Sequence, residues 1–352
     1  MIIPIYALHI RVTNAYIAMQ PRNNGPRGKS LASLGRYIIR RLLFMIPVFL
    51  GVAILTYLVG NAAGNPLDLI RAGMRNPSPK VIEALTRYYH LDRPVYERFL
   101  LWLWQLLHGD LGVSVTGRSV GQQIGAWAIT TLELQVAALV LSVVIGIPVG
   151  VYSAKNQYSK SDYAITSVAI FGYSMPTFWL GIMLIIVFSF ELGWLPSSGA
   201  QGITFMWGGN PVFDHLAHLV LPTIVLTYVE LATIVRLVRA NMMEVLRQDY
   251  VLAARASGLS ERAVTYRYAL RNAVSPVVTV LGLTFGAALG GAPATETTFS
   301  WPGLGYAFAQ AALQLDIPLV QGITVIITLM VLAANLITDL CYAILDPRVR
   351  ME

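Results

Sequence analysis

Residues 42–63 read LLFMIPVFLGVAILTYLVGNAA, a run of 22 residues without a charged side chain. A helix of about 20 mainly apolar residues is long enough to cross the hydrocarbon core of a bilayer. Five more stretches are similarly long and apolar: 128–151, 164–192, 216–238, 277–295 and 318–345. The sequence therefore predicts an all-α polytopic membrane protein with six transmembrane helices.

The composition excludes most other classes of protein. Hydrophobic residues make up 56% of the 352 residues and charged residues 12%, whereas soluble proteins are about 25% charged. The mean hydropathy is +0.61. A single cysteine, Cys341, excludes a disulfide scaffold, and the abundance of Leu, Ile and Val excludes a disordered chain.

The net charge of +7 could suggest nucleic acid, but the positions of the basic residues favour membrane topology. With the N-terminus inside, 18 of the 25 Lys and Arg residues fall on the inner side. The other seven lie in the long external segment 64–127, and long segments translocate largely regardless of charge. We therefore expect a multi-pass protein of the plasma (inner) membrane with both termini cytoplasmic, and no nucleic-acid partner.

The connection between the fourth and fifth spans carries the most information. Residues 242–257 read MMEVLRQDYVLAARAS and predict a helix that Gly258 terminates, after which Ser260 caps a second short helix. Ala253, Ala254 and Ala256 are small and leave room for another protein to approach. Asp249 and Arg255 could add charged contacts at the rim of such an interface. The alternative is an ordinary connecting loop.

This connection resembles a known family. Residues 250–260 (YVLAARASGLS), followed by 269–273 (ALRNA) and Pro276, are similar to the EAA coupling loop of ABC importer permeases of the dipeptide/oligopeptide/nickel family. The resemblance extends over about residues 35–350. It is carried by 36–42, 91–94, 109–112, 192–196, 296–305 and 346–350. One departure is Leu252, which stands where the general pattern has Glu.

The resemblance implies the type I ABC importer permease fold (MetI-like) and the first, B-type, permease subunit. It implies a heterodimer with a second permease, two ATPase subunits and an extracellular or periplasmic solute-binding protein. The chain has no G-x-x-x-x-G-K-[ST] phosphate loop, so we expect a non-catalytic subunit whose ATPase partners use ATP and Mg. We expect no cofactor or metal on this chain.

The same resemblance divides the chain and assigns candidate sites. Residues 1–34 are an N-terminal extension, 35–63 the first transmembrane helix and 64–127 an extracellular subdomain, which either meets a delivery partner or lies on the bilayer. Residues 128–345 form a five-helix permease core with a cytoplasmic coupling loop, 241–275, and 346–352 a cytoplasmic tail. The candidate coupling residues are Asp249, Tyr250, Ala253, Ala254, Arg255, Ala256, Gly258 and Leu259. Candidate docking residues for the binding protein are Asp110, Trp301 and Gly303.

Polar groups and helix breakers inside the spans suggest a translocation path. Its candidates are Ser174, Met175 and Pro176, which interrupt span three, Glu230 in span four, and Thr279 and Thr284 in span five. Glu230 could bind a solute amine or pair with another helix. Glycines at spacing four in spans two and five allow close helix packing or line a gate.

Several alternatives remain open on the sequence alone. Di- or oligopeptides are the favoured solute, and oligosaccharides or metal chelates are the alternatives. A secondary transporter would need inverted repeats, which the sequence does not show. A serine–histidine intramembrane protease would pair Ser174 with His215 or His218, and a metal site at these histidines would need further ligands.

Overall fold

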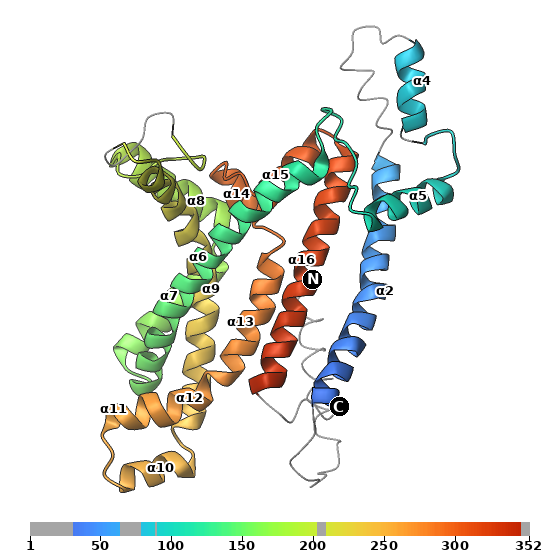
Figure 1. Ribbon diagram of the computed structural model, residues 1–352. Helices are drawn as coiled ribbons and strands as arrows, with labels where there is room; N and C mark the ends of the chain where they lie inside the picture. The colour runs from blue at the N-terminus through green and yellow to red at the C-terminus, as the bar shows by residue number, and fades with distance from the viewer. Residues whose placement is uncertain (1–30, 64–78, 89, 203–208, 346–352) are drawn as a thin grey trace.

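A computed structural model describes residues 31–63, 79–88, 90–202 and 209–345 (Figure 1). Four of its helices are long and apolar enough to cross a membrane: α2 (Leu31–Ala63), α6 (Val120–Lys155), α9 (Pro211–Val245) and α16 (Ile317–Leu345). Two bent helix pairs pass the same test, which brings the number of candidate spans to six when each pair counts as one. The expected polytopic helical fold is therefore confirmed.

The first bent pair is α7 (Lys160–Ser174) with α8 (Thr177–Leu184), which continues as the π-helix η1 (Ile185–Glu191) and bends by 103°. The second joins residues 261–273 to α13 (Ser275–Ala288) with a bend of 49°. The shorter elements are α4 (Pro79–Tyr88), α5 (Val95–Leu107), α10 (Asp249–Ala256), α11 (Glu261–Ala263), η2 (Val264–Ala269), α12 (Leu270–Ala273), α14 (Pro293–Thr298) and α15 (Leu304–Leu313).

Three helices begin or end beyond the spans expected from the sequence. Helix α2 begins at Leu31 and so includes the end of the expected N-terminal extension. Helix α6 begins at Val120, inside the expected external subdomain, and α9 continues to Val245, inside the expected coupling loop. The expected spans ended where the apolar residues end, whereas the helices continue into the polar residues beside them. Residues 1–30 and the tail 346–352 lie outside the described residues.

Glycines bring α6 and α9 into close contact. A Cβ atom added at Gly146 would lie 2.7 Å from Ile234 Cγ2, and one added at Gly150 would lie 2.7 Å from Val238 Cβ. Such distances leave no room for a side chain. The packing interpretation of these glycines is therefore supported, because side chains of α9 occupy the space that a Cβ atom on α6 would fill.

We expect Gly150→Leu to reduce the stability of the protein by about 1–3 kcal/mol, the usual cost of overpacking a tight interior. The matched control is Gly125→Leu in the same helix, where no atom lies within 4 Å of the added Cβ. The thermal unfolding midpoint in detergent measures the difference. Equal midpoints for the two variants would show that α6 and α9 are not in close contact.

Close packing also joins α13 to α16. Gly282 faces the Thr338 side chain, and a Cβ at Gly286 would lie 2.8 Å from Asn335 Oδ1. Gly290, the third glycine of the expected series, lies beyond the end of α13.

A buried ion pair joins neighbouring helices at the end of the bundle where α10 lies. Asp162 in the first turn of α7 accepts hydrogen bonds from Arg239 Nε and Nη2 in α9, both at 2.7 Å. Its carboxylate also accepts bonds from the Tyr158 backbone N–H at 2.8 Å and from the Ser153 hydroxyl of α6. One carboxylate therefore connects α6, α7 and α9.

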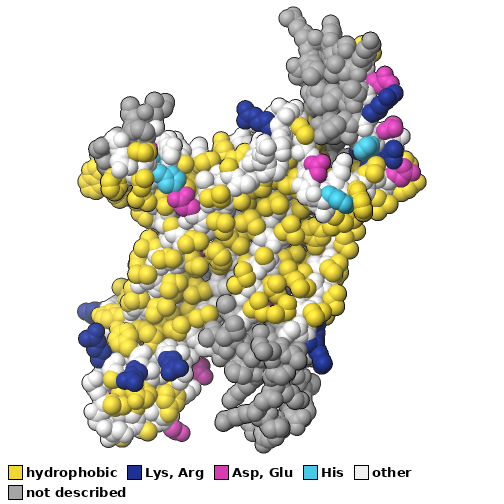
Figure 2. Space-filling model, in the orientation of Figure 1, with side chains coloured by type: hydrophobic (Ala, Val, Ile, Leu, Met, Phe, Trp, Pro, Cys, Tyr) yellow, Lys and Arg dark blue, Asp and Glu magenta, His cyan; other side chains and the backbone are white. Residues whose placement is uncertain are grey.

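The surface carries a broad belt of hydrophobic side chains, with charged side chains towards the two ends of the molecule (Figure 2). Helix α2 contributes strongly to this belt, since only 11% of its most apolar stretch is buried. Exposed apolar surface of this extent indicates contact with lipid or with another membrane subunit.

Candidate coupling and translocation sites

Helix α10 packs against η2, which continues directly into α12, at one end of the molecule (Figure 1). Val251 and Ala254 are buried in the same hydrophobic cluster as Val264 and Ala269. Asn272 Nδ2 donates a hydrogen bond of 2.6 Å to the Tyr250 hydroxyl. These contacts hold α10 against the rest of the chain, so that a displacement of α10 must also displace η2 and α12.

The end of α10 follows the sequence prediction. Gly258 has φ +78°, and its N–H donates to the Arg255 carbonyl at 2.9 Å. Left-handed backbone of this kind is strained for side chains with a Cβ atom and is usual for glycine after a helix. Ser260 then caps α11 by accepting a hydrogen bond from the Ala263 N–H at 3.4 Å.

The expected continuous helix over 242–257 is wrong. Helix α9 ends at Val245, and α10 begins at Asp249 after a turn. Both Val245 and Val251 are buried in one cluster, whereas six positions apart on a single helix they would point to different faces. The turn between α9 and α10 allows both valines to enter the same cluster.

The candidate coupling residues divide between two faces of α10. Ala254 is buried inside the chain, so the expectation that it contributes small surface to a partner is wrong. The outward-facing candidates are Asp249, Ala253, Arg255, Ala256, Gly258 and Leu259, and Tyr250 lies at the border of this set with 36% exposure. Leu252, in the place of the family's Glu, is 49% exposed. Arg255 Nε is 2.9 Å from Glu261 Oε1.

The candidate path residues do not form one cluster. Met175 and Pro176 separate α7 from α8, and the Ser174 hydroxyl donates to the Ile170 carbonyl at 3.0 Å. Glu230 of α9 is partly buried and accepts a hydrogen bond of 3.1 Å from the Ser142 hydroxyl of α6. Its carboxylate therefore has a partner on a neighbouring helix.

A mainly apolar cavity of about 260 Å³ adjoins α13 and α16. Thr279 lines it together with Leu139, Gly282 and Phe285. Thr284 is only partly buried and is not among the lining residues. Of the six candidate path residues, the structure therefore places Thr279 alone in this cavity.

Two of the three candidate docking residues are buried inside the chain, so the expectation that they contact the binding protein directly is wrong. Trp301 is fully buried and donates from Nε1 to the Thr130 carbonyl at 3.0 Å. Gly303 is also buried, and a Cβ there would lie 2.5 Å from the Glu296 carboxylate. Both residues fill the interior where α14 and α15 contact α6. Asp110 is exposed, and its carboxylate accepts a 2.9 Å hydrogen bond from the Gly112 N–H.

Glu296, which was not among the candidate site residues, lies at the centre of this interior. Its carboxylate accepts hydrogen bonds from the N–H groups of Ala292 and Tyr306, at 3.2 and 2.9 Å, and from the Thr131 hydroxyl at 3.2 Å. Burial raises the pKa of the Glu296 carboxyl, and these hydrogen bonds oppose that rise. The sequence feature that could have pointed to this role is the glutamate at the first position of the motif 296–305.

The groups required for a protease or metal site have other partners. His215 Nε2 lies 2.7 Å from Glu133 Oε1, and His218 Nδ1 lies 2.8 Å from the Asp214 carbonyl. Ser174 is bonded within its own helix. Within the described ranges, no group of three or more His, Cys, Asp and Glu residues could hold a metal ion.

The candidate membrane spans, the hydrophobic belt and the α10 hairpin at one end of the bundle define a class: a multi-pass helical membrane protein with a projecting helix. Residues 146–351 match the family described as "Binding-protein-dependent transport system inner membrane component". More than half of the chain is covered, and the chain belongs to this family.

Curated relatives are similar over nearly the whole chain. The oligopeptide transport system permease protein AppB of Bacillus subtilis (strain 168) is 40% identical, over 90% of this chain and 99% of that protein. The dipeptide transport system permease protein DppB of Escherichia coli (strain K12) is 40% identical, over 90% and 98%. A solved structure of the inward-facing MetNI methionine ABC transporter matches 62% of this chain and 95% of that chain, with TM-score 0.47 and 19% identity. The family and these relatives make the chain a non-catalytic permease subunit of an ABC importer.

Proposed function

We propose that this permease subunit passes di- or oligopeptides from an external binding protein into the cytoplasm. The observation that carries the proposal is the 40% identity, over 90% of the chain, to permeases of oligopeptide and dipeptide transport systems. A second homologous permease completes the membrane part, and two ATPase subunits use ATP and Mg. Oligosaccharides are the alternative solute.

The α10 end faces the cytoplasm in this proposal, and both termini lie on the same side. The support is the distribution of Lys and Arg, of which seven lie between positions 236 and 271 in and beside the connection that contains α10. The external segment then includes α4 and α5, and exposed Asp110 is the remaining candidate for contact with the binding protein.

The outward face of α10 is the surface that contacts an ATPase subunit. Ala253 and Ala256 permit close approach, and exposed Leu252 and Leu259 supply apolar contact in place of the family's carboxylate. The ion pair of Arg255 with Glu261 lies at the rim, where it contributes to orientation more than to affinity.

Calorimetric titration of the binding protein encoded beside this chain tests the solute. We expect heat with a mixture of di- and oligopeptides and none with a mixture of oligosaccharides. Heat with the sugars alone would reject the peptide assignment and leave the importer assignment intact. Peptide uptake by cells that lack this chain, and its recovery when the chain is restored, gives the second measurement.

Glu230→Gln is expected to lower peptide uptake at low peptide concentration at least tenfold, because a charged contact with the peptide ammonium contributes about 1.5–3 kcal/mol. Gln can still accept the hydrogen bond from Ser142, so the helix contact survives. Ser142→Ala is the matched control, since it removes the hydroxyl and keeps the carboxylate. Unchanged uptake in Glu230→Gln would mean that Glu230 only pairs the helices.

A further inference from the structure

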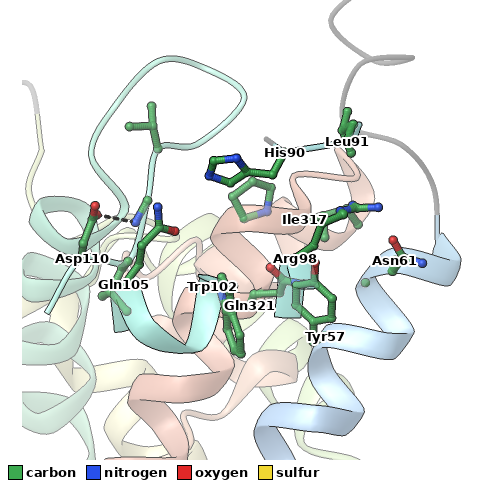
Figure 3. A pocket seen from close by; sticks show the side chains of 15 residues that line it. Tyr57, Asn61, His90, Leu91, Arg98, Trp102, Gln105, Asp110, Ile317 and Gln321 are labelled. Atoms are coloured by element: carbon green, nitrogen blue, oxygen red, sulfur yellow. Dashed lines mark hydrogen bonds between the residues drawn. The ribbon is translucent and has the colours of Figure 1, made fainter. Parts of the chain in front are cut away.

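A second cavity, of about 170 Å³ (Figure 3), lies beside α5, at the end of the molecule opposite α10 (Figure 1). Helices α2, α5 and α16 and the segments just before and after α5 form its walls. Figure 3 shows Arg98, Tyr57 and Asn61 on one side of the cavity and Gln105 and Asp110 across from them. It lies apart from the apolar cavity beside α13 and from α10.

Arg98 gives this cavity a cation that needs an anion. Its Nε is buried and has no hydrogen-bond partner, and Tyr57 lines the cavity beside the guanidinium. In the part of the chain that the structure describes, no carboxylate forms an ion pair with Arg98. A partly buried guanidinium is stabilised when a bound anion supplies the missing acceptor.

The position of the cavity suggests the source of that anion. Tyr57 and Asn61 belong to the last two turns of α2, and Ile317 and Pro318 begin α16. The cavity therefore lies where two membrane spans end. Lipid phosphates occupy this depth in a bilayer, which is also where Trp and Tyr side chains gather.

Apolar surface flanks the cavity on the side of α5. Phe99 and Trp102 of α5 pack on Tyr57, each with its ring centroid 5.4 Å from the tyrosine ring. Trp104 and Leu107 of the same helix are exposed, at 64% and 68%. A helix with large apolar side chains exposed in this way is suited to lie along the membrane surface.

We propose that this cavity binds the phosphate of a phospholipid headgroup, with Arg98 as the principal contact. Arginine is suited to phosphate because its planar guanidinium can donate two parallel hydrogen bonds. The amides of Asn61 and Gln105 supply further donors for the phosphate or glycerol oxygens. The acyl chains lie along the exposed surfaces of α2 and α5. The bound lipid fixes α5 to the ends of α2 and α16.

The test uses the full-length chain in its purified complex, in detergent, titrated with dihexanoyl phosphatidylglycerol and observed by native mass spectrometry. We expect one lipid on the wild-type protein that Arg98→Gln weakens at least tenfold. Arg98→Lys should recover part of the affinity because it restores the charge. Arg93→Gln is the matched control: Arg93 is exposed and is not among the residues that line the cavity.

Equal lipid affinity in Arg98→Gln and wild type would overturn the proposal, provided that both variants show the same thermal unfolding midpoint. Titration with inorganic phosphate distinguishes a free anion from a lipid. Phosphate that binds through Arg98 as tightly as the short-chain lipid would also overturn the lipid assignment. Dihexanoyl glycerol, which lacks the phosphate, is expected to bind at least tenfold more weakly.

Discussion

Gly258→Val is expected to uncouple the importer: peptide uptake falls at least tenfold while the assembled complex continues to hydrolyse ATP. Gly258 has φ +78°, a conformation that costs a residue with a Cβ atom about 1–2 kcal/mol and a β-branched residue more. Relief of this strain would move the turn after α10 and change the position of exposed Leu259. Uptake of labelled peptide and ATPase activity, measured on the same reconstituted vesicles, test the expectation.

Gly258→Asn is the matched control for this variant. No atom of this chain lies within 4 Å of a Cβ added at Gly258, so neither variant is expected to clash within the chain. Asparagine visits the left-handed region more readily than other non-glycine residues. We expect its uptake to stay close to that of the wild type. Normal uptake by Gly258→Val at normal expression would contradict the proposed role of this turn.

Glu296→Ala is expected to destabilise the end of the bundle opposite α10 by several kcal/mol. The change removes the acceptor for the N–H groups of Ala292 and Tyr306 and for the Thr131 hydroxyl. Each buried polar group left without a partner costs about 1–3 kcal/mol. The measurement is the thermal unfolding midpoint of the purified protein, together with the amount of protein that reaches the membrane.

Thr297→Ala serves as the control for the glutamate variant, because Thr297 is exposed in the same short helix. We expect its midpoint to match the wild type. Glu296→Gln should fall between the two, since its amide oxygen replaces only one of the two carboxylate oxygens. A midpoint for Glu296→Ala equal to that of Thr297→Ala would show that the carboxylate does not hold α14 and α15 in place.

The sequence predicted those features that depend on residues close together in the chain. The apolar runs predicted the spans because about 20 such residues fix a helix in a bilayer. Gly258 and Ser260 predicted the end of α10 and the start of α11, since a left-handed turn and a cap are local requirements. The family itself was evident from motifs such as 250–260.

The errors arose where tertiary contacts decide the structure. Trp301 and Gly303 look like a loop surface in the sequence, and only their contacts with Thr130 and Glu296 show that they are interior. Ala254 is buried while Ala253 and Ala256 are exposed, which depends on how α10 sits on η2. The cavity around Arg98 combines residues from three separate helices, and no local pattern brings them together.

Helix α9 links the two ends of the molecule mechanically. With 35 residues and a rise of about 1.5 Å per residue, it is about 50 Å long. The Asp162–Arg239 pair and the glycine contacts of α6 hold α6, α7 and α9 together, so that the three helices move as one rigid unit. A tilt of about 5° would therefore move its far end, near His215, by about 4 Å. A small displacement at α10 can therefore shift the opposite end of α9 without breaking a hydrogen bond between these three helices.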